Sequence, residues 1–521
     1  MIRGLDARYH TARHALRGCV WVLVAIFVGS PCTSFAQAVP SPTTLAQQIN
    51  AYIDQPQFTR ADWGIALRSL DSGQTLYAHN ATRLFVPAST AKLFTAGLAL
   101  ADLGSATRIA TTLYATSTRI SANGTLRGDL ILYGRGDPSL GLAATTPDWA
   151  DHMAVALKQR GIKRIVGNLI ADATYFAGSR IGAGWEANDL QTWYGAPASA
   201  LNVDGNLMHV TVARDGRRCC DVSVTPDAAG IAISNQTSAD ATQPLSLYRP
   251  PGSATLFALG QLPARAQRHT YALSLPDPER AAAETLRQAL ARTGITLAGK
   301  IVVLRWPESD PAVSRPGTQA LASVESPTIA ELVAHTLKDS DNLFAQALWL
   351  QVGTNAAQRR TCIASPTPTT SADWALCALH AILQRAGIAA DAVLLAEGSG
   401  LARQNLVTPD ALVAWLAWTA TQPWGADFRA ALPVAGVDGT LATRFRTGPA
   451  TDNLRAKTGT LSHDYTLAGF VTDAAGEHLA FAIMLNRYPR WEVARSDPAV
   501  PAPKHLLDAV AKLIAVYAGK S

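Results

Sequence analysis

This chain of 521 residues has little charge for its length. Asp, Glu, Lys and Arg make up 16% of it, against 48% hydrophobic residues, and this composition indicates folded domains rather than a disordered chain. The formal net charge is only +6, and no basic run is dense enough to predict a nucleic-acid partner. The length exceeds what one core can use, so we expect about two to four domains. We find no internal repeat.

Long apolar runs are absent after the N-terminus, so we expect no membrane span in the rest of the chain. Residues 1–38 instead have the pattern of a cleaved secretory signal peptide. Arginines precede the apolar run at residues 19–28, and small-residue cleavage patterns follow at 34–36 and 36–38. An uncleaved membrane anchor is the alternative, although the run is short for a span. We therefore predict an exported protein.

Cysteine is scarce, and removal of the signal peptide leaves Cys219, Cys220, Cys362 and Cys377. An even number in an exported protein permits disulfides. We favour a bond between Cys362 and Cys377, which closes a modest loop. A bond between the adjacent pair would be strained, and the sequence leaves its state open. No cluster of His or carboxylates accompanies these cysteines at ligand spacing, so we predict no metal site and no cofactor.

The stretch with the most chemical content is residues 87–92, PASTAK, which an Ala- and Leu-rich run follows. This run favours a helix, and Pro87 is a helix-start signal. The spacing then places the Lys92 amine over the Ser89 hydroxyl. A neutral lysine can activate a serine nucleophile, provided that burial or a second cation lowers its pKa from about 10.4. The structural alternative is a helix-capping Ser89 with a solvated Lys92.

Two further motifs follow in order. They are Ser340-Asp341-Asn342 and, nearer the C-terminus, Lys457-Thr458-Gly459. Together with Ser-x-x-Lys they form the signature of the penicillin-interacting serine enzymes, which include penicillin-binding proteins and class A β-lactamases. An ordered triple of this kind is improbable by chance, whereas Ser-x-x-Lys alone is weak evidence.

More than one domain length of chain separates the first motif from the second. The parts of one site can be so far apart in sequence only if the intervening segment folds by itself. We therefore predict an inserted, strand-rich region at residues 107–320 that is made of two subdomains. It interrupts a domain built from residues 39–106, which carry Ser-x-x-Lys, and residues 321–521, which carry the other two motifs.

The patterning predicts the elements of these regions. Helices are expected over 44–53, 149–159, 279–292, 328–338, 342–353, 374–386 and 505–517. Strands are expected over 63–70, 74–77, 109–116, 128–133, 165–171, 300–305, 465–471 and 478–486, with several short ones in 207–275. We expect a linker at 309–326, a surface loop at 354–372 and a glycine-rich turn at 394–401. The last helix should pack on a sheet; binding of its apolar face to a membrane is the alternative.

At this level of detail the sequence resembles a known family. The chain looks like the class C low-molecular-mass penicillin-binding proteins, the D-alanyl-D-alanine carboxypeptidases and endopeptidases of the bacterial cell wall. The stretches that carry the resemblance are 87–92 (PASTAK), 136–140 (GDPSL), 338–342 (KDSDN), 398–406 (GSGLARQNL), 432–440 (LPVAGVDGT) and 456–460 (AKTGT). The resemblance implies an α+β, β-lactamase/transpeptidase-like domain with an antiparallel sheet, interrupted by the large insertion.

The resemblance also implies roles. Ser89 would be the nucleophile and Lys92 its base. Ser340 would assist Lys92 and pass a proton to the leaving amine. Asn342 would bind the substrate amide, and Lys457 would supply positive charge that also lowers the Lys92 pKa. The oxyanion hole would be the N–H groups of Ser89 and Thr460, and the substrate carboxylate would meet the rest of the third motif, Thr458, Gly459 and Thr460. Asn342 and Thr460 could instead be a helix cap and a plain strand residue.

The resemblance further implies recognition of a diaminopimelate-bearing stem peptide, as in that family, and three residues of this chain match the positions involved. Asp189 matches the acid that meets the side-chain amine, Tyr194 stands at an aromatic position of the pocket, and Arg403 matches the basic residue for the side-chain carboxylate. Two departures leave the side-chain preference open: Glu397 replaces the usual Asp, and Ser462 stands where some members have Gln. Asp189 and Arg403 could instead form ordinary surface ion pairs.

The function that follows is a serine-type D-Ala-D-Ala carboxypeptidase and endopeptidase of the periplasm. It would act on peptidoglycan stem peptides and cross-links through an acyl-enzyme on Ser89, and penicillin would inhibit it covalently. We expect no nucleic-acid partner and at most peripheral membrane association. The alternatives are a β-lactamase or esterase on the same fold, for which we find no clearly placed deacylating Glu, and a non-catalytic cell-wall-binding protein. The intact serine and lysines argue against the last.

Overall fold

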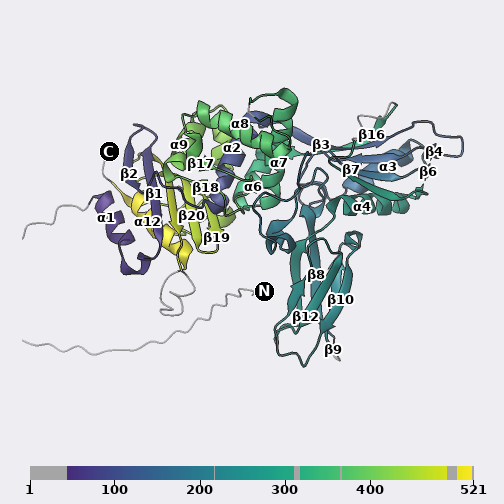
Figure 1. Ribbon diagram of the computed structural model, residues 1–521, viewed down its shortest axis with the longest axis horizontal. Helices are drawn as coiled ribbons and strands as arrows, with labels where there is room; N and C mark the ends of the chain where they lie inside the picture. Colours follow the sequence, from purple (N-terminus) through teal and green to yellow (C-terminus); the bar gives the residue numbers. More distant parts are fainter. Residues whose placement is uncertain are drawn as a thin grey trace, which may run out of the picture. The chain divides into compact units, whose positions relative to one another are not determined.

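The computed structural model describes residues 44–215, 218–263, 265–309, 317–363, 366–489 and 502–518. The predicted signal peptide, residues 1–38, lies outside them. Within these ranges, no helix combines the length and apolar character that crossing a membrane requires. The compact unit Leu45–Ser521 is a mixed α+β fold with two five-stranded sheets and several smaller ones (Figure 1).

The first sheet joins the two ends of the chain. Its order is β19-β20-β21-β1-β2, and every neighbouring pair is antiparallel. The strands are β1 (Asp62–Ser69), β2 (Thr75–His79), β19 (Arg455–Leu461), β20 (Asp464–Thr472) and β21 (His478–Asn486). Strand β1 pairs with β21 along its whole length, so the first and last predicted hairpins are both confirmed and form one sheet.

The two faces of this sheet carry different side chains, as the alternation along a strand allows. Large residues such as Ile65 and Leu67 point to one face, where α1 (Leu45–Ile53) and α12 (Pro503–Val516) cover them. The other face carries mainly alanines, such as Ala66, and α9 (Pro409–Ala420) packs on it. The predicted packing of the last helix on the sheet is confirmed.

A group of helices shares one hydrophobic core cluster with α9. They are η2 (Ala88–Ala91), α2 (Lys92–Leu103), α6 (Ile329–Lys338), α7 (Asn342–Arg359), α8 (Ser371–Arg385) and α10 (Gly425–Ala430). The first of them, η2, also contacts β19 and β20. Helix α7 is longer than predicted, so the loop expected at 354–372 is wrong for its first six residues. Thr354 and Ala356 are buried, which shows that the packed face of the helix continues past residue 353.

The second five-stranded sheet has the order β15-β7-β5-β3-β16. Its strands are β3 (Arg108–Ala115), β5 (Leu130–Tyr133), β7 (Leu169–Ala173), β15 (Ile301–Arg305) and β16 (Gln319–Thr328), and the helices α3 (Trp149–Gln159) and α4 (Pro278–Thr293) accompany it. A small sheet, β14-β6-β4, adds Thr296–Leu297, Arg164–Val166 and Thr125–Arg127. We propose that this second sheet is the core of the insertion predicted at 107–320.

Two predictions in this region are wrong. The strand expected over 165–171 is two strands in different sheets, because the chain turns at Asn168, whose N–H donates to the Asp129 carboxylate at 2.8 Å. The linker expected at 309–326 includes β16, which pairs with β3. Serine and proline content suggested a linker, but half of that segment completes a sheet edge; residues 310–316 lie outside the described ranges.

The short strands predicted in 207–275 form two three-stranded sheets. One is β13-β8-β9, made of Arg268–Ser274, Leu207–Asp215 and Arg218–Thr225. The other is β10-β12-β11, made of Ala232–Thr237, Thr255–Gly260 and Ser246–Tyr248.

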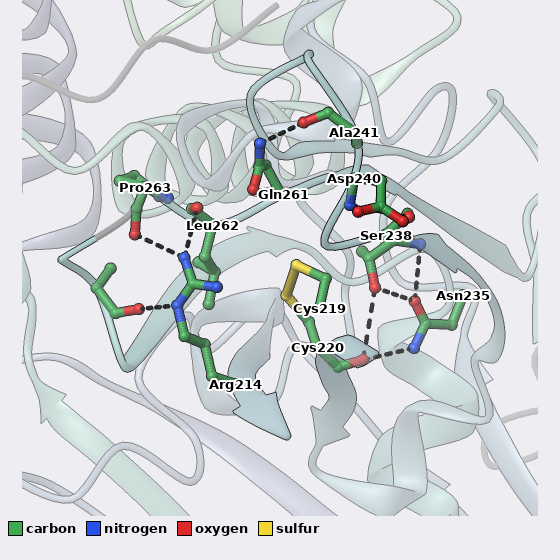
Figure 2. The surroundings of a disulfide bond; sticks show 12 residues. Arg214, Cys219, Cys220, Asn235, Ser238, Asp240, Ala241, Gln261, Leu262 and Pro263 are labelled. Carbon is green, nitrogen blue, oxygen red and sulfur yellow. Dashed lines mark hydrogen bonds between the residues drawn. A yellow bond between two sulfur atoms is a disulfide. The ribbon is translucent and has the colours of Figure 1, made fainter. Parts of the chain in front are cut away.

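Both pairs of cysteines are bonded. Cys362 and Cys377 form the predicted disulfide. Cys219 and Cys220, whose state the sequence left open, form a buried bond between neighbours on β9. Figure 2 shows that Asn235 of β10 donates to the Cys220 carbonyl, at 2.9 Å. The bonded pair is thus tied to the neighbouring sheet.

Candidate active site

Ser89 lies in η2, the single 3-10 turn before α2, so the α-helix begins at Lys92 rather than at the serine. The preceding residue, Ala88, has a φ of 47°, which is left-handed backbone. Such a conformation is unfavourable for a residue with a Cβ and persists only where packing imposes it. Ser89 itself is partly exposed.

Lys92 is fully buried and has three acceptors around its amine. Its Nζ lies 2.9 Å from Ser89 Oγ, 2.6 Å from Asn342 Oδ1 and 2.6 Å from the Ser399 carbonyl oxygen. An ammonium group can donate to all three, but a neutral amine has only two hydrogens. If the two shorter bonds keep those hydrogens, the amine lone pair is directed at Ser89 Oγ. This is the geometry that a general base for Ser89 requires.

Burial also favours the neutral amine. It lowers the pKa of Lys92 to about 8, although the negative charges of Glu397 and Asp341 act in the opposite direction. We expected Lys457 to lower this pKa, but burial is the largest cause. The repulsion is evident at Lys457 instead: burial, then Lys92 and Arg444, hold the pKa of Lys457 well below its ordinary value. Two buried lysines so close together cannot easily both carry a proton.

The Lys92 pKa gives a pH prediction. If Lys92 is the base for acylation of Ser89, the reaction needs the neutral amine, so its rate constant should rise about tenfold per pH unit below about 8 and level off above it. The measurement is the second-order rate constant for acylation by a β-lactam between pH 6 and 10, with circular dichroism to confirm that the fold is unchanged. A midpoint near 10 would contradict a buried base.

The second motif occupies the turn between α6 and α7. Ser340 has a φ of 61°, and Asp341 caps α7 through the Phe344 N–H at 3.1 Å. Ser340 Oγ accepts from Lys457 Nζ at 2.8 Å, so its direct partner is Lys457 rather than Lys92. Because the turn points Ser340 toward β19 while Asn342 reaches Lys92, it links the two lysines of the site.

The third motif lies against Ser89 and Pro87. A Cβ added at Gly459 would be 3.0 Å from the Ser89 nitrogen and 2.8 Å from the Pro87 oxygen, so only glycine allows β19 to pass this close to η2. Thr466 of β20 donates to the same Pro87 oxygen at 2.7 Å. Thr460 is exposed at the end of β19, where its N–H can share an oxyanion with that of Ser89.

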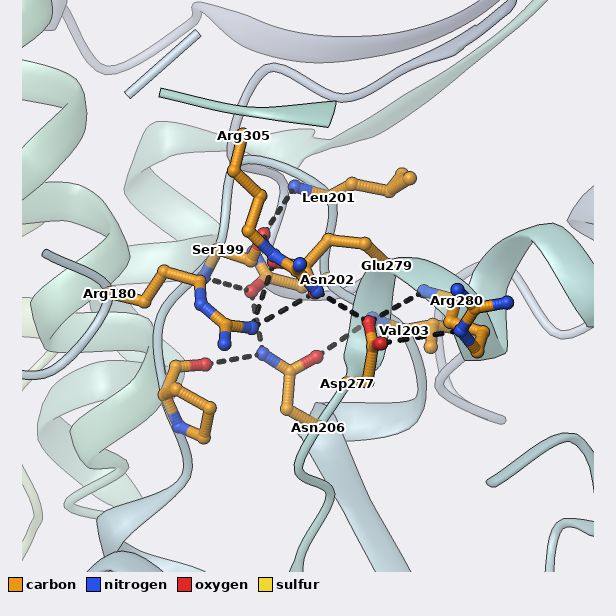
Figure 3. A network of polar contacts seen from close by, with 11 residues as sticks. Arg180, Ser199, Leu201, Asn202, Val203, Asn206, Asp277, Glu279, Arg280 and Arg305 are labelled. Atoms are coloured by element: carbon orange, nitrogen blue, oxygen red, sulfur yellow. Dashed lines mark hydrogen bonds and ion pairs between the residues drawn. The ribbon is translucent and has the colours of Figure 1, made fainter. Parts of the chain in front are cut away.

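A loop of the second sheet region forms another wall of the site. Figure 3 shows the two ends of this loop, at Arg180 and Ser199. Buried Glu279 of α4 holds them together: it pairs with Arg180 at 2.9 Å and accepts from Ser199 at 2.7 Å. Arg305 binds the same carboxylate. Between Arg180 and Ser199 the loop carries Tyr194, whose carbonyl accepts a hydrogen bond from the side-chain amide of Asn342 at 2.9 Å. The remote segment therefore contributes directly to the site.

This loop brings Asp189 and Tyr194 to the side of Arg403. Asp189 accepts from the Glu186 N–H at 3.0 Å, and burial, together with the nearby Glu186, raises its pKa. Arg403 pairs with Glu186 at 3.1 Å and with Asp464 at 3.4 Å. The three residues predicted for stem-peptide recognition are thus close together, but the guanidinium of Arg403 already has carboxylate partners.

Sequence reasoning missed one support of the site. Both carboxylate oxygens of buried Glu397 accept bonds, from the N–H groups of Ser399 and Gly400 at 2.7 Å each and from Asn405 at 2.8 Å. These bonds shape the turn that directs the Ser399 carbonyl at Lys92. The sequence signals were the glycine-rich turn and the resemblance, which marked Glu397 only as a replacement of the usual Asp. Among the described residues, no three His, Cys, Asp or Glu side chains lie together as a metal site.

Comparison with known proteins identifies the family of the chain. Residues 45–500 match the model of the D-Ala-D-Ala carboxypeptidase 3 (S13) family. The chain is 31% identical over 503 residues to a D-alanyl-D-alanine carboxypeptidase of Actinomadura sp. (strain R39), which covers 92% of this chain and 85% of that one. It is 28% identical to the D-alanyl-D-alanine carboxypeptidase DacB of Haemophilus influenzae, with 84% and 88% covered.

The fold agrees as well. The crystal structure of penicillin binding protein 4 (dacB) from Haemophilus influenzae superposes with a TM-score of 0.75 at 28% identity, covering 87% of this chain and 95% of that one. The same protein complexed with a β-lactam superposes with a TM-score of 0.71 at 25% identity, covering 88% and 97%.

Proposed function

The chain belongs to the D-Ala-D-Ala carboxypeptidase 3 (S13) family of penicillin-binding serine peptidases, and we propose that Ser89 is its nucleophile and Lys92 the base. The contact that supports this most directly is the 2.9 Å between Lys92 Nζ and Ser89 Oγ, with two further acceptors for the amine hydrogens. The predicted fold class and serine-type activity agree with the family.

In the acylation step, Ser89 Oγ attacks the carbonyl carbon between the two D-alanines while Lys92 takes the hydroxyl proton. The N–H groups of Ser89 and Thr460 bind the oxyanion, each contributing ~3 kcal/mol to the barrier reduction. Expulsion of the terminal D-alanine requires a proton on its nitrogen. Ser340 delivers that proton from its hydroxyl and is reprotonated from Lys457, its partner at 2.8 Å. The proton that Lys92 took from Ser89 then replaces the one that Lys457 gave, so Lys92 is neutral again before deacylation.

Deacylation regenerates the enzyme. Water attacks the ester carbonyl, Lys92 again removes the proton, and Ser89 Oγ leaves and is reprotonated. The stem peptide is released with a new carboxylate. Asn342 holds Lys92 through Oδ1 and the Tyr194 carbonyl through one amide hydrogen, so its second amide hydrogen is left to bind the substrate's peptide carbonyl.

We propose peptidoglycan stem peptides ending in D-Ala-D-Ala, and the cross-links derived from them, as the substrates, and the periplasm as the location. Thr458 and Thr460 would bind the carboxylate beside the scissile bond, with positive charge from Lys457. Asp189 would meet an amine on the stem side chain and Arg403 a carboxylate. Tyr194 would line that pocket.

Glu186 should weaken the binding of a substrate side-chain carboxylate to Arg403, because it competes for the same guanidinium. The variant Glu186→Gln removes the competing charge and should raise kcat/KM about tenfold for peptides whose side chain carries a carboxylate, relative to peptides with only an amine. Glu186 is more than half exposed, so folding should not change. Equal kcat/KM ratios in the variant and the wild type would show that Glu186 leaves Arg403 when substrate binds.

The proposal is tested by incubating the protein that lacks residues 1–38 with benzylpenicillin, followed by intact-mass and peptide mapping. A slowly lost adduct on the Ser89 peptide is expected. Rapid consumption of the drug without an adduct would indicate a β-lactamase. An adduct on another residue, or neither adduct nor drug loss, would overturn the assignment of Ser89.

A further inference from the structure

A threonine outside the three motifs contacts the carboxylate side of the site. Thr440 lies in η8 (Gly439–Leu441), and its Oγ1 accepts a hydrogen bond from Oγ1 of Thr458 in β19 at 2.9 Å. Both side chains are only partly buried. Two hydroxyls at this distance share one hydrogen, and the other hydrogen remains free to donate elsewhere.

The loop that carries Thr440 is fixed to the turn of Ser340. Asp438 accepts from the Val434 N–H at 2.8 Å and pairs with Lys338, two residues before Ser340. Lys338 Nζ also donates to the Leu432 carbonyl at 3.2 Å. The charge of Asp438 is therefore compensated, and this carboxylate repels an incoming anion less than a free one would.

Backbone packing fixes the same loop. Gly439 has a φ of 55°, and a Cβ there would lie 2.7 Å from the Lys338 carbonyl oxygen. The loop thus rests on the end of α6 with no room for a larger residue. Thr440 is held in place by its neighbours on both sides, and its distance to β19 is set by the turn that also sets Ser340.

From this geometry we propose that Thr440 is a positioning residue for the substrate carboxylate and acts through Thr458. When a carboxylate binds, the Thr458 hydrogen turns to it and Thr440 donates to Thr458 Oγ1 instead. This keeps the Thr458 hydroxyl in the donor orientation that an anion needs, and a hydrogen bond to a charged group is among the stronger ones. The inference rests on the proposed function, because it assumes that Thr458 binds the carboxylate α to the scissile nitrogen.

The proposal makes a selective prediction. Thr440→Val has nearly the same shape but no hydroxyl. It should lower the acylation rate constant for benzylpenicillin about tenfold and leave that for benzylpenicillin methyl ester, which has no carboxylate, within twofold of wild type. For a D-Ala-D-Ala peptide the loss should be mainly in KM rather than kcat. Thr440→Ser keeps the hydroxyl and should behave as wild type.

The outcomes separate three explanations. An equal loss for the acid and the ester would mean that Thr440 only supports the loop, and no change for either would mean that it has no role; both overturn the proposal. Lys338→Met, which frees the loop without touching Thr440, should show a smaller loss with the same acid preference. Peptide mapping of the wild type accompanies the assay, since a lack of labelling at Ser89 there would refute the proposed function instead.

Discussion

Replacing Ser89 with Ala should abolish covalent labelling by benzylpenicillin and reduce carboxypeptidase activity ~10⁴-fold or more. The reason is structural. Ser89 Oγ is the only hydroxyl in hydrogen-bond contact with the Lys92 amine in the part of the chain that the structure describes. Ser340, the other serine of the motifs, is bound to Lys457 instead. The measurement is intact mass after drug exposure, with product release from a D-Ala-D-Ala peptide as the second readout.

This variant should fold normally. It removes a single hydroxyl, and Lys92 keeps its bonds to Asn342 and the Ser399 carbonyl. The melting temperature serves as the control for folding, and non-covalent binding of the peptide should persist. Labelling that survives at full stoichiometry would mean that the nucleophile is elsewhere.

The second large effect is expected at Lys92, where Lys92→Arg and Lys92→Met should each lower the acylation rate constant ~10²- to 10⁴-fold. Arginine retains a positive charge and several donors, but its pKa is too high for it to accept a proton. Methionine has a similar length and suits a fully buried position, but it leaves the Ser399 carbonyl without its donor. A proton acceptor is lost in both variants, and only in the second is the charge lost as well.

The two variants distinguish a base from a charge. If Lys92 acted only by its positive charge, the arginine variant would stay active and the methionine variant would not. If it is the base, both fail in acylation. Lys338→Met, which removes a lysine at the edge of the site, is the matched control and should acylate within about tenfold of wild type. Melting temperatures of all three show whether a loss reflects unfolding.

The sequence by itself predicted the contact between Ser89 and Lys92 and the hairpins of the first sheet, because the patterns that indicate them are local. The spacing of Ser89 and Lys92 predicts a shared helical face, and the structure brings the two together. Alternating apolar residues and turn signals predicted both hairpins of the first sheet. The distance between the motifs predicted an intervening folded region. Each of these inferences needs only the chain's own periodicity or length.

Composition was less reliable than pattern. The segment at 309–326 has the serine and proline content of a linker, yet β16 within it pairs with β3, some two hundred residues earlier in the chain. Likewise α7 continues beyond residue 353 because its surroundings bury it. In both cases contacts with distant parts of the chain decided the secondary structure, and local sequence patterns do not predict such contacts.

Only the tertiary structure decided which side chains of the site contact one another and how deeply they are buried. The motifs named Ser340 and both lysines, but the fold pairs Ser340 with Lys457 and makes burial the main cause of the low Lys92 pKa. It also gives contacts in the site to Glu397 and Thr440, which lie outside the three motifs. The sequence by itself thus supplies the side chains that we propose as the reacting groups. Their partners, their burial and hence their protonation depend on which distant segments pack together, and these are properties of the folded chain.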